Sequence, residues 1–377
     1  MDNKRRLAYL SFGKFPSVTA HSVHIVNMCQ ALSEIGWDVT LIADIREDRE
    51  KIISHYGIKT PFKLVSVPLK NIRFLGRMWA LKKISSYLRR ETFDVLYTRD
   101  IFNGRLAAST NLPFYFELHE LPTNRIRRGL LKSLLKSPGL NKFVFISNKM
   151  ELLFQEEYRH QLPSSCVAHD GVDLVNFHVD VPKTELREEL GFSPSGFIAG
   201  YTGSLFPGRG VEVILDMAQK RPETTFVIVG GEGRFFDELR TSRKISSLNN
   251  LILTGYVPYR SIPKYLAAFD VLLMPYQKHV LHRQVKHDTV KYMSPLKMFE
   301  YMASGRPIVS SSLPVLKEVL KDQYNALLVT PDNIVAWDEA LNKIMTNPGL
   351  AESLAKHALE DVRRYTWKAR ALNIMRG

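Results

Sequence analysis

The residues best suited to chemistry stand in one short segment, from Thr289 to Val309. Within it, Ser294 is a good N-cap and Pro295 suits the first position of a helix. Gly305, with a proline two residues later, is typical of a helix end. The segment therefore predicts a short helix whose start is open to a ligand.

The first turn of this helix combines backbone donors with charged side chains. The N–H groups of Leu296 and Lys297 lack helical acceptors and stand at the positive end of the helix dipole, which predicts a site for a phosphate-like anion. The charge of Lys297 opposes that dipole unless a bound anion faces it. Glu300, one turn further on the same side, could accept the hydroxyls of a ribose. The alternative is an ordinary capped helix with a Lys297–Glu300 surface pair.

The composition is that of a soluble globular protein with room for two domains: 377 residues, of which 45% are hydrophobic and 24% charged. No apolar run approaches the ~18 residues of a membrane span, and no signal-peptide pattern follows Lys4. We therefore expect a cytoplasmic protein. Cys29 and Cys166 are far apart and have no metal-ligand spacing around them, which predicts neither a disulfide framework nor a zinc site.

The excess of basic residues, a net charge of +14, is concentrated between Lys70 and Lys142, where 15 basic and 5 acidic residues stand. Residues 75–90 and 125–136 combine the apolar spacing of helices with many basic side chains. Such basic amphipathic helices can bind an anionic membrane surface at the inner face of the cell membrane. Alternatively, their apolar stripes face the core and the basic residues are solvated. We expect no nucleic-acid partner, because no aromatic-studded basic strand or recognition helix accompanies the charge.

Short apolar runs alternate with helical patterns along almost the whole chain. The runs that predict strands are Leu7 to Phe12, Val39 to Ala43, Leu64 to Val67, Val95 to Tyr97, Phe114 to Leu118, Phe143 to Ile146, Cys166 to Ala168, Phe197 to Tyr201, Phe226 to Val229, Leu251 to Leu253, Val271 to Met274, Ile308 to Ser310 and Leu327 to Val329. Alternating strands and helices indicate parallel sheets covered on both faces. The chain therefore predicts two doubly wound α/β domains, residues 1–178 and 179–364.

Ligands of such sheets bind beyond the carboxyl ends of the strands, where the connecting loops begin. After the first strand, a loop that contains Thr19 and Ala20 leads to a helix predicted from about Val23. After the strand Phe114 to Leu118, His119 opens the next loop and is a candidate for contacting substrate. A structural histidine with satisfied hydrogen bonds is the alternative.

In the second half, glycine-containing loops follow three successive strands. Gly203 and Ser204 follow the first, and Gly230 to Gly233 follow the next; glycines let the backbone come close to a ligand. Arg209, at the approach to a helix start, could hold a phosphate with its two-pronged guanidinium. Tyr256 follows the third strand, where it could flank a base or simply pack. Together these loops are expected to line one edge of a cleft.

These motifs resemble glycosyltransferase family 4, a retaining family with the GT-B fold, in which two Rossmann-like doubly wound parallel-sheet domains face a central cleft. The resemblance covers essentially the whole chain. The segments that carry it are Asp170 to Phe177, Tyr201 to Ser204, Gly208 to Gly210, Val229 to Gly233, Leu253 to Val257, Ser294 to Gly305, Asn325 to Val329 and Tyr365 to Trp367.

The resemblance implies transfer of a hexose from a nucleotide-diphosphate-sugar donor to a glycan or lipid-linked acceptor, in cell-surface polysaccharide or glycolipid assembly. It implies no cofactor and no metal ion, because cationic side chains around the diphosphate would stabilise the leaving group. The implied catalytic residues are His119, Arg209, Lys297 and Glu300. The implied donor-binding positions are Thr19, Ala20, Gly203, Ser204, Arg209, Tyr256, Ser294, Pro295, Leu296, Lys297 and Glu300.

Within that set, the resemblance assigns different parts of the donor to different residues. Arg209 and Lys297 match positions that hold the diphosphate, and Glu300 matches one that holds the ribose. The Tyr256 strand end lies near the base. His119 matches a histidine that lines the sugar pocket from the first domain.

Two positions depart from the family pattern. The first glutamate of a paired motif, eight positions before Glu300, is Tyr292 here, and Thr19 and Ala20 replace a glycine pair. A catalytically weak nucleotide-binding partner subunit is therefore one alternative, and a nucleotide-sugar epimerase of the same fold is another. The last helix of the family returns to the first domain, so residues 365–377 are expected to pack there.

Overall fold

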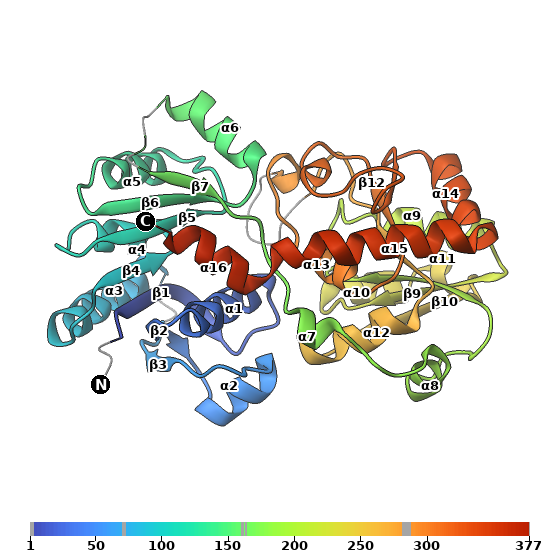
Figure 1. Cartoon of the computed structure of the whole chain (residues 1–377), viewed down its shortest axis with the longest axis horizontal. Coiled ribbons are helices and arrows are strands. Elements are labelled where there is room, and N and C mark those ends of the chain that lie inside the picture. The colour runs from blue at the N-terminus through green and yellow to red at the C-terminus, as the bar shows by residue number, and fades with distance from the viewer. Residues whose placement is uncertain (1–3, 70–72, 160–161, 163, 281–287, 377) are drawn as a thin grey trace. The chain divides into compact units, whose positions relative to one another are not determined.

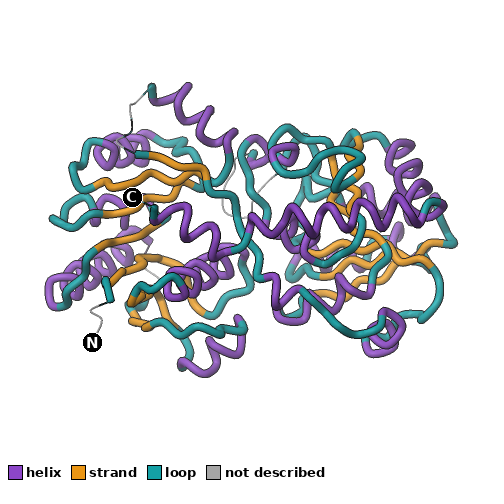
Figure 2. Tube along the Cα trace, in the orientation of Figure 1, coloured by secondary structure: helices purple, strands orange, loops and turns teal. Residues whose placement is uncertain are grey.

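The structure, a computed structural model, describes residues 4–69, 73–159, 162, 164–280 and 288–376 (Figure 1). The chain divides into two compact units: unit 1 consists of residues 1–170 and 367–377, and unit 2 of residues 171–366. Each unit has its own parallel sheet with helices on both faces (Figure 2). The predicted fold class of two doubly wound parallel-sheet domains is confirmed.

Unit 1 contains a seven-stranded parallel sheet in the order β3-β2-β1-β4-β5-β6-β7. Its strands are β1 Arg6–Phe15, β2 Asp38–Ile45, β3 Lys63–Ser66, β4 Val95–Thr98, β5 Phe114–Leu118, β6 Leu140–Phe145 and β7 Ser165–Val167. Its helices are α1 Ala20–Glu34, α2 Arg49–Tyr56, α3 Arg73–Arg90, α4 Ile101–Ala107, α5 Arg125–Leu135, α6 Asn148–Tyr158 and α16 Trp367–Met375. The strand order reverses between β1 and β4, which is where such sheets bind ligands.

Right-handed crossovers between these strands put α1 and α2 on one face of the sheet and α3, α4 and α5 on the other. On the first face α16 packs beside α1, so the end of the described chain returns to unit 1 (Figure 1). Strands β4 and β5 are buried along their whole length, because helices cover both faces of a central parallel strand. All the runs predicted as strands in this half are strands.

The helix after the first strand begins earlier than predicted. It starts at Ala20 rather than near Val23, because Thr19 is its N-cap and accepts a hydrogen bond from the N–H of Ser22 at 3.4 Å. Both Thr19 and Ala20 are exposed. These two residues therefore form the junction between the loop and the helix.

Unit 2 contains a six-stranded parallel sheet in the order β10-β9-β8-β11-β12-β13. Its strands are β8 Phe197–Thr202, β9 Thr224–Val229, β10 Leu251–Gly255, β11 Val271–Met274, β12 Ile308–Ser311 and β13 Leu327–Val329. Its α-helices are α7 Leu174–Phe177, α8 Lys183–Glu189, α9 Val211–Lys220, α10 Arg234–Arg240, α11 Arg243–Ser246, α12 Ile262–Ala268, α13 Leu296–Ala303, α14 Ile334–Thr346 and α15 Pro348–Val362. Short 3₁₀ helices are η1 Tyr259–Ser261, η2 Thr289–Lys291, η3 Leu316–Glu318 and η4 Arg363–Tyr365.

The core of unit 2 has two layers, one on each face of its sheet. Along β9, Phe226 and Ile228 pack with α9 and α14, whereas Val227 and Val229 pack with the layer that contains α12, α13 and α15. Successive side chains of a strand point to opposite faces, so a continuous apolar run is needed to fill both layers. This is why the strands of this half are recognisable in the sequence.

Helix α13 lies close to where the sequence predicted it, but its cap differs. Pro295 is the N-cap residue, with an extended backbone at φ −78° and ψ 126°, so Ser294 stands one residue too early. The predictions that Ser294 caps the helix and that Pro295 is its first residue are therefore wrong. At the other end, Gly305 has φ +68°, a left-handed conformation typical of helix ends.

The boundaries of the units differ from the predicted ones at 178/179 and 364/365. The turn after Asp170 belongs to unit 2, where the N–H of Val172 donates to the carbonyl oxygen of Tyr365 at 2.9 Å. Tyr365 and Thr366 belong to unit 2 as well, and α16 alone of the late helices returns to unit 1 among the described residues. Within the described ranges, no helix is long and apolar enough to cross a membrane.

Candidate functional site

Lys297 is the centre of the candidate site in unit 2. It stands in the first turn of α13 and is only 9% exposed. Its Nζ lies 3.7 Å from the ring centroid of Tyr201 and 5.4 Å from that of Tyr276. Nζ makes no hydrogen bond to any described residue. An ammonium group that rests on aromatic faces keeps its N–H donors available for an anion.

The surroundings of Lys297 disfavour its charged form. Burial lowers the pKa of Lys297 well below its ordinary value, and the guanidinium of Arg209 lowers it further, while Glu300 acts in the opposite direction. An approaching anion would reverse this balance, because a negative charge stabilises the ammonium form. The buried amine of Lys297 is therefore suited to binding a negatively charged group.

Gly203, directly after β8, leaves room for the Lys297 ammonium. Its φ is +135°, and a Cβ at this position would lie 2.6 Å from Lys297 Nζ. The N–H of Gly203 donates to the carbonyl oxygen of Val229 at 2.9 Å, and the N–H of Gly230 donates to that of Gly255 at 2.9 Å. The three loops that the sequence singled out in this half are therefore joined side by side.

Arg209 is held against one of the tyrosines that Lys297 contacts. Its Nη1 donates to the hydroxyl of Tyr276 at 3.0 Å, and its guanidinium lies 5.2 Å from the Tyr276 ring centroid. Its Nε is buried and has no hydrogen-bond partner among the described residues. The loop can approach this closely because Gly208 has φ +85° and stands where a Cβ would meet the carbonyl oxygen of His279 at 1.9 Å. Two cations with unused donors thus converge on Tyr276.

A hydroxyl group from α13 ties the helix to the end of β8. The N–H of Thr202 donates to the Tyr301 hydroxyl at 2.7 Å, and both residues are buried. The hydroxyl of Tyr201 donates to the carbonyl oxygen of Ser204 at 2.7 Å. These bonds fix the end of β8 and the loop that contains Gly203 and Ser204 against α13.

The remaining predicted residues of unit 2 lie around this centre. Glu300 stands one turn after Lys297, as the spacing predicted, but it is 6% exposed, so the two residues do not form a surface pair. Ser294 is buried, and Pro295 and Leu296 are partly exposed at the helix start. Tyr256 is 44% exposed directly after β10. The structure therefore brings Gly203, Arg209, Lys297 and Glu300 together and leaves Tyr256 on the surface.

A second cluster lies in unit 1 at the carboxyl end of β5. His119 is hydrogen-bonded through Nε2 to Oε1 of Glu117, and the Tyr97 hydroxyl on β4 donates to the same carboxylate. Burial, followed by the charge of Arg99, lowers the pKa of His119 to about 3, although Glu117 acts in the opposite direction. The imidazole is therefore neutral at ordinary pH.

The Glu117 carboxylate is fully buried and is contacted from several elements. On α1, His24 places Nε2 2.9 Å from Oε1 of Glu117 and Nδ1 2.9 Å from Oδ1 of Asp170. On α16, Arg370 donates from Nη2 to Oε1 of Glu117 at 2.9 Å. Burial raises the pKa of Glu117, but Arg370, then His24 and His119, hold it well below its ordinary value.

Three members of this cluster have the chemistry of metal ligands. His24, Glu117 and His119 offer ligand atoms within 4.8 Å of one another, and two imidazoles with a carboxylate are typical of zinc sites. Arg370, however, already lies 2.9 Å from the carboxylate, where its charge would repel a divalent cation. These residues fit a hydrogen-bonded network better than a metal centre.

Of the residues in this cluster, His119 was predicted from the sequence, whereas Glu117, His24 and Arg370 were not. One signal was available, because Glu117 is a charged residue within the apolar strand Phe114–Leu118, and a buried charge needs a partner. No spacing rule identifies that partner, since Arg370 stands 253 positions away along the chain.

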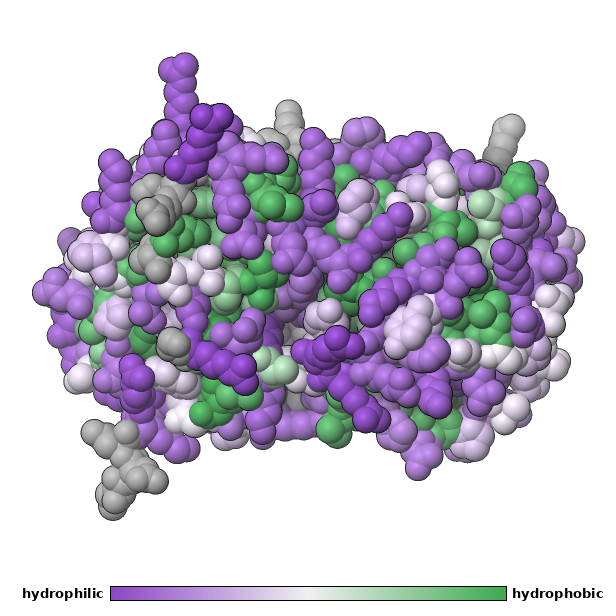
Figure 3. All heavy atoms as spheres, turned by 45° about the horizontal axis from the view of Figure 1, so that its top comes forward, coloured by the Kyte–Doolittle hydropathy of each residue, from purple (hydrophilic) through white to green (hydrophobic). Residues whose placement is uncertain are grey.

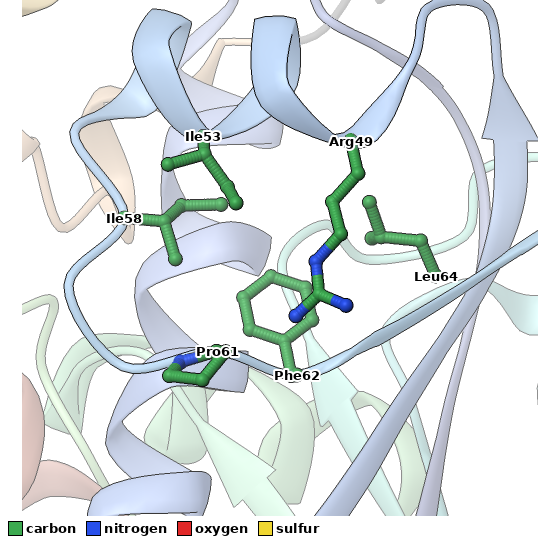
Figure 4. Close-up of a pocket in the computed structure, with 6 residues that line it drawn as sticks. All are labelled: Arg49, Ile53, Ile58, Pro61, Phe62 and Leu64. Carbon is green, nitrogen blue, oxygen red and sulfur yellow. The ribbon is translucent and has the colours of Figure 1, made fainter.

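A small hollow beneath α2 is separate from both clusters. It is lined by Ile53, Phe62 and Leu64, with Arg49 at its edge, and its volume is about 10 Å³ (Figure 4). That is room for about one water molecule. The hollow is therefore too small for a nucleotide or a sugar.

Comparison with known proteins identifies the family. The sequence model of Glycosyltransferase Family 4 matches residues 21–176, and that of Glycosyl transferases group 1 matches residues 182–361. Together the two matches span most of both units. The chain therefore belongs to the family 4 glycosyltransferases and has the GT-B fold, as the sequence motifs implied.

Individual relatives are distant. The chain is 22% identical over 296 residues to the UDP-Gal:alpha-D-GlcNAc-diphosphoundecaprenol alpha-1,3-galactosyltransferase of Escherichia coli. This alignment covers 73% of this chain and 72% of that protein. It is 25% identical over 211 residues to the D-inositol 3-phosphate glycosyltransferase of Xylanimonas cellulosilytica, with 53% of this chain and 48% of that protein covered. The chain likewise spans about half or less of several other curated relatives. Among solved structures, Anabaena Alr3699/HepE in complex with UDP and glucose has a TM-score of 0.77 at 16% identity, covering 98% of this chain and 97% of that chain.

Proposed function

We propose that this glycosyltransferase moves a sugar from a nucleotide-diphosphate-sugar donor to a glycan or lipid-linked acceptor, in cell-surface polysaccharide or glycolipid assembly. The proposal includes retention at the anomeric carbon and no requirement for a metal ion. The observation that carries it is the buried Lys297 ammonium, which has no hydrogen-bond partner among the described residues. Burying such a group costs free energy, and a bound anion would offset that cost.

A nucleotide diphosphate is the anion that suits these residues. The first-turn N–H groups of α13, Nζ of Lys297 and Nε of Arg209 are donors for its phosphates. Glu300, one turn behind, is an acceptor for ribose hydroxyls, and the exposed ring of Tyr256 is available to flank the base. The Anabaena structure with UDP and glucose, which shares the fold, supports this choice of donor class.

The same cations would assist the reaction. Breaking the bond between sugar and phosphate puts negative charge on the leaving diphosphate, and Lys297 and Arg209 would stabilise that charge more in the transition state than in the ground state. They would take the place of a metal ion. We propose that an oxygen of the leaving phosphate accepts the proton of the acceptor hydroxyl, while the acceptor oxygen bonds to the anomeric carbon and the bond from that carbon to the phosphate breaks. Attack on the face of the leaving group gives retention.

The residues of unit 1 are proposed to serve the sugar and the acceptor. The neutral imidazole of His119 offers an uncharged hydrogen-bonding group to the sugar. Thr19 and Ala20, exposed at the start of α1, are proposed to lie along the donor and the acceptor.

The acceptor is proposed to come from an anionic membrane surface. In α3 and α5 the apolar side chains of the later turns, such as Ile84 and Leu134, are buried, as the core-facing alternative predicted. The first turns differ, because Leu75, Met78 and Ile126 are 67%, 51% and 72% exposed. Exposed apolar side chains at basic helix starts are suited to the interface of an anionic membrane.

Helices α3 and α5 both pack against α4. Burial raises the pKa of Asp100, the N-cap residue of α4, although the N–H groups of Asn103 and Phe102 and, to a smaller extent, the charges of Arg77 on α3 and Arg127 on α5 act in the opposite direction. The guanidinium of Arg77 also lies 5.6 Å from the ring centroid of Phe102 on α4. Exposed apolar side chains and arginines attract a membrane in two ways, by burial of apolar surface and by electrostatic attraction to anionic lipids. On the face that Figure 3 presents, apolar side chains lie in separate groups among hydrophilic ones.

The test is nucleotide release from a panel of UDP-, GDP-, dTDP- and ADP-sugars, with and without an anionic lipid extract and a metal chelator. We expect turnover of one donor, higher with the extract and unchanged by the chelator, and a product of retained anomeric configuration by NMR. Lys297→Met and Glu300→Gln should lose this turnover, whereas Lys356→Met, an exposed lysine on α15, should keep it. Turnover that survives in Lys297→Met would contradict the proposal.

Two outcomes would favour the alternatives. Nucleotide binding without turnover of any donor would favour a partner subunit, an alternative motivated by Tyr292, which is buried before α13 where the family has a glutamate. Interconversion of donor sugars without an acceptor would identify an epimerase.

A further inference from the structure

We infer that Glu117 and Arg370 are positioning residues for His119, which fix the proton of its imidazole on Nε2 and leave Nδ1 to accept a hydrogen bond from a hydroxyl of the bound sugar. The inference rests on the proposed function, because it assumes that a sugar meets His119. It adds to that function a network that joins β5 to α16.

The Glu117 carboxylate is an acceptor, so the ring nitrogen beside it must be a donor. Arg370 contacts both oxygens of Glu117, at 2.9 Å from Nη2 to Oε1 and at 3.3 Å from Nη1 to Oε2. A guanidinium on both oxygens keeps a buried carboxyl group ionised, and an ionised carboxylate has no proton to give. Nε2 of His119, which is hydrogen-bonded to Oε1, therefore carries the proton.

Whether the His119 ring is neutral determines whether its Nδ1 is a hydrogen-bond donor or an acceptor. Burial, followed by the charge of Arg99, lowers the pKa of His119 to about 3, so the imidazole carries one proton near neutral pH. Because that proton is on Nε2, Nδ1 is an acceptor. Nδ1 makes no hydrogen bond to any described residue, and the His119 side chain is 16% exposed. A sugar hydroxyl can therefore donate to Nδ1 but cannot accept from it.

His24 lies on the other side of the Glu117 carboxylate. Its ring lies edge-on to that of His119, with centroids 4.9 Å apart, and its two nitrogens each lie 2.9 Å from a carboxylate oxygen. The titratable and charged groups that face His119 are Glu117 on β5, His21 and His24 on α1, Arg99 after β4 and Asp170 after β7. With contacts from α1, β4 and α16, the Glu117 carboxylate has one orientation.

Arg370 is itself fixed by the backbone of unit 1. It is 4% exposed. Its Nε donates to the carbonyl oxygen of His169 at 3.0 Å, and its Nη2 also donates to that of Ala168 at 3.2 Å. The planar guanidinium of Arg370 donates to the Glu117 carboxylate and to two backbone carbonyl oxygens at once. A lysine ammonium could not replace it, because it lacks this fixed arrangement of donors.

The tautomer of His119 can be read from its ring ¹⁵N chemical shifts, assigned by comparison with His119→Gln. In the wild-type protein we expect a protonated Nε2 and a bare Nδ1 from about pH 5 to 8, because the ring stays neutral over that range. A ring protonated on Nδ1, or one that titrates near the ordinary histidine pKa, would overturn the inference.

Two substitutions should change the pH behaviour differently. Arg370→Met leaves Glu117 without its counter-charge, so the pKa of His119 should rise and kcat should fall at acid pH, where the wild-type kcat is flat. Glu117→Gln removes the negative charge, so the pKa of His119 should fall further and kcat should not decrease at acid pH. The variant nevertheless allows the proton of His119 to lie on either ring nitrogen. Both variants should lower kcat by about tenfold to a hundredfold, the effect of one hydrogen bond in the transition state, with the nucleotide Kd unchanged.

Asn373→Ala is the matched control. Asn373 also ties α16 to unit 1, but through the carbonyl oxygen of Val167 at 3.0 Å rather than through Glu117. It should leave kcat and the ¹⁵N shifts as in the wild type; if it reproduced the effects of Arg370→Met, docking of the helix would be the cause and the inference would fail. If the wild-type protein turns over no donor, the proposed function fails, and the ¹⁵N shifts still decide whether Glu117 fixes the tautomer.

Discussion

The Nζ atom of Lys297 lies 3.7 Å from the centroid of the Tyr201 ring, so a basic amine is stacked on an aromatic face inside unit 2. The ring attracts the ammonium form, yet burial still lowers the pKa of Lys297. The ligand-free protein is therefore less stable than it would be with an apolar side chain here. A bound anion reverses that disadvantage.

Lys297→Met should raise the free energy of unfolding of the ligand-free protein by about 1 kcal/mol, because it removes a desolvated amine without leaving a cavity. The same variant should bind the donor nucleotide about tenfold to a hundredfold more weakly, since a charged hydrogen bond is lost. Urea denaturation with and without nucleotide measures both effects. A large loss of stability in the ligand-free variant would show that Lys297 has a structural role.

Nucleotide binding should take up a proton at pH values above the lowered pKa of Lys297. The pKa of Lys297 is lowered in the free protein, and a bound diphosphate would raise it again. Below the lowered pKa the amine is already charged, so uptake begins as pH rises through that pKa, and affinity falls over the same range. Isothermal titration calorimetry in buffers of different ionisation enthalpy measures the uptake. Heats that are independent of the buffer, or uptake that persists in Lys297→Met, would contradict this assignment.

Gly203→Ala should disturb the anion site directly. The new Cβ would lie 2.6 Å from Lys297 Nζ at a residue with φ +135°, so both the fold and the position of the ammonium should suffer. We expect a loss of about 1–3 kcal/mol of stability and weaker nucleotide binding. Gly196→Ala is the control, because Gly196 has φ +92° with open space around it. Thermal unfolding should respond in both variants and nucleotide affinity only in Gly203→Ala.

Tyr301→Phe and Tyr276→Phe should separate stability from binding. The Tyr301 hydroxyl accepts the N–H of Thr202 at 2.7 Å, so its removal leaves a buried donor unpaired and should cost about 1–3 kcal/mol. The Tyr276 hydroxyl accepts from Arg209 at 3.0 Å, and its removal should loosen that guanidinium and weaken nucleotide binding more than stability. Urea denaturation and calorimetry on both variants check this contrast, and equal effects would refute it.

Leu75→Ser combined with Ile126→Ser should reduce flotation of the protein with vesicles that contain anionic phospholipid. These side chains are 67% and 72% exposed at the starts of α3 and α5, so the substitutions should not alter stability. Raising the salt concentration should weaken flotation of the wild type as well. Val175→Ser, at a residue of unit 2 that is 75% exposed, is the control. Unchanged flotation of the double variant would exclude this surface as the membrane contact.

The alternation of apolar runs was enough to predict every strand of both sheets, because a central parallel strand must be apolar on both faces. The start of α13 was misplaced because proline suits both the N-cap and the first helical position, and only the backbone conformation of Pro295 distinguishes them. The amphipathic patterns of α3 and α5 could not show which of their apolar side chains are buried, because burial depends on how neighbouring helices pack against each turn. The partners of Glu117 come from distant parts of the chain and leave no local pattern.

The position of Arg370 in α16 also bears on how the protein is made. During translation, unit 1 is completed only after all of unit 2 has emerged, because α16 follows unit 2 in the chain. Glu117 therefore lacks its ion pair with Arg370 until all of unit 2 has been synthesised. Burying a carboxylate without such a partner costs free energy. A nascent chain halted at residue 366 would contain every residue of unit 2 beside a first unit that is still open at the carboxyl end of β5.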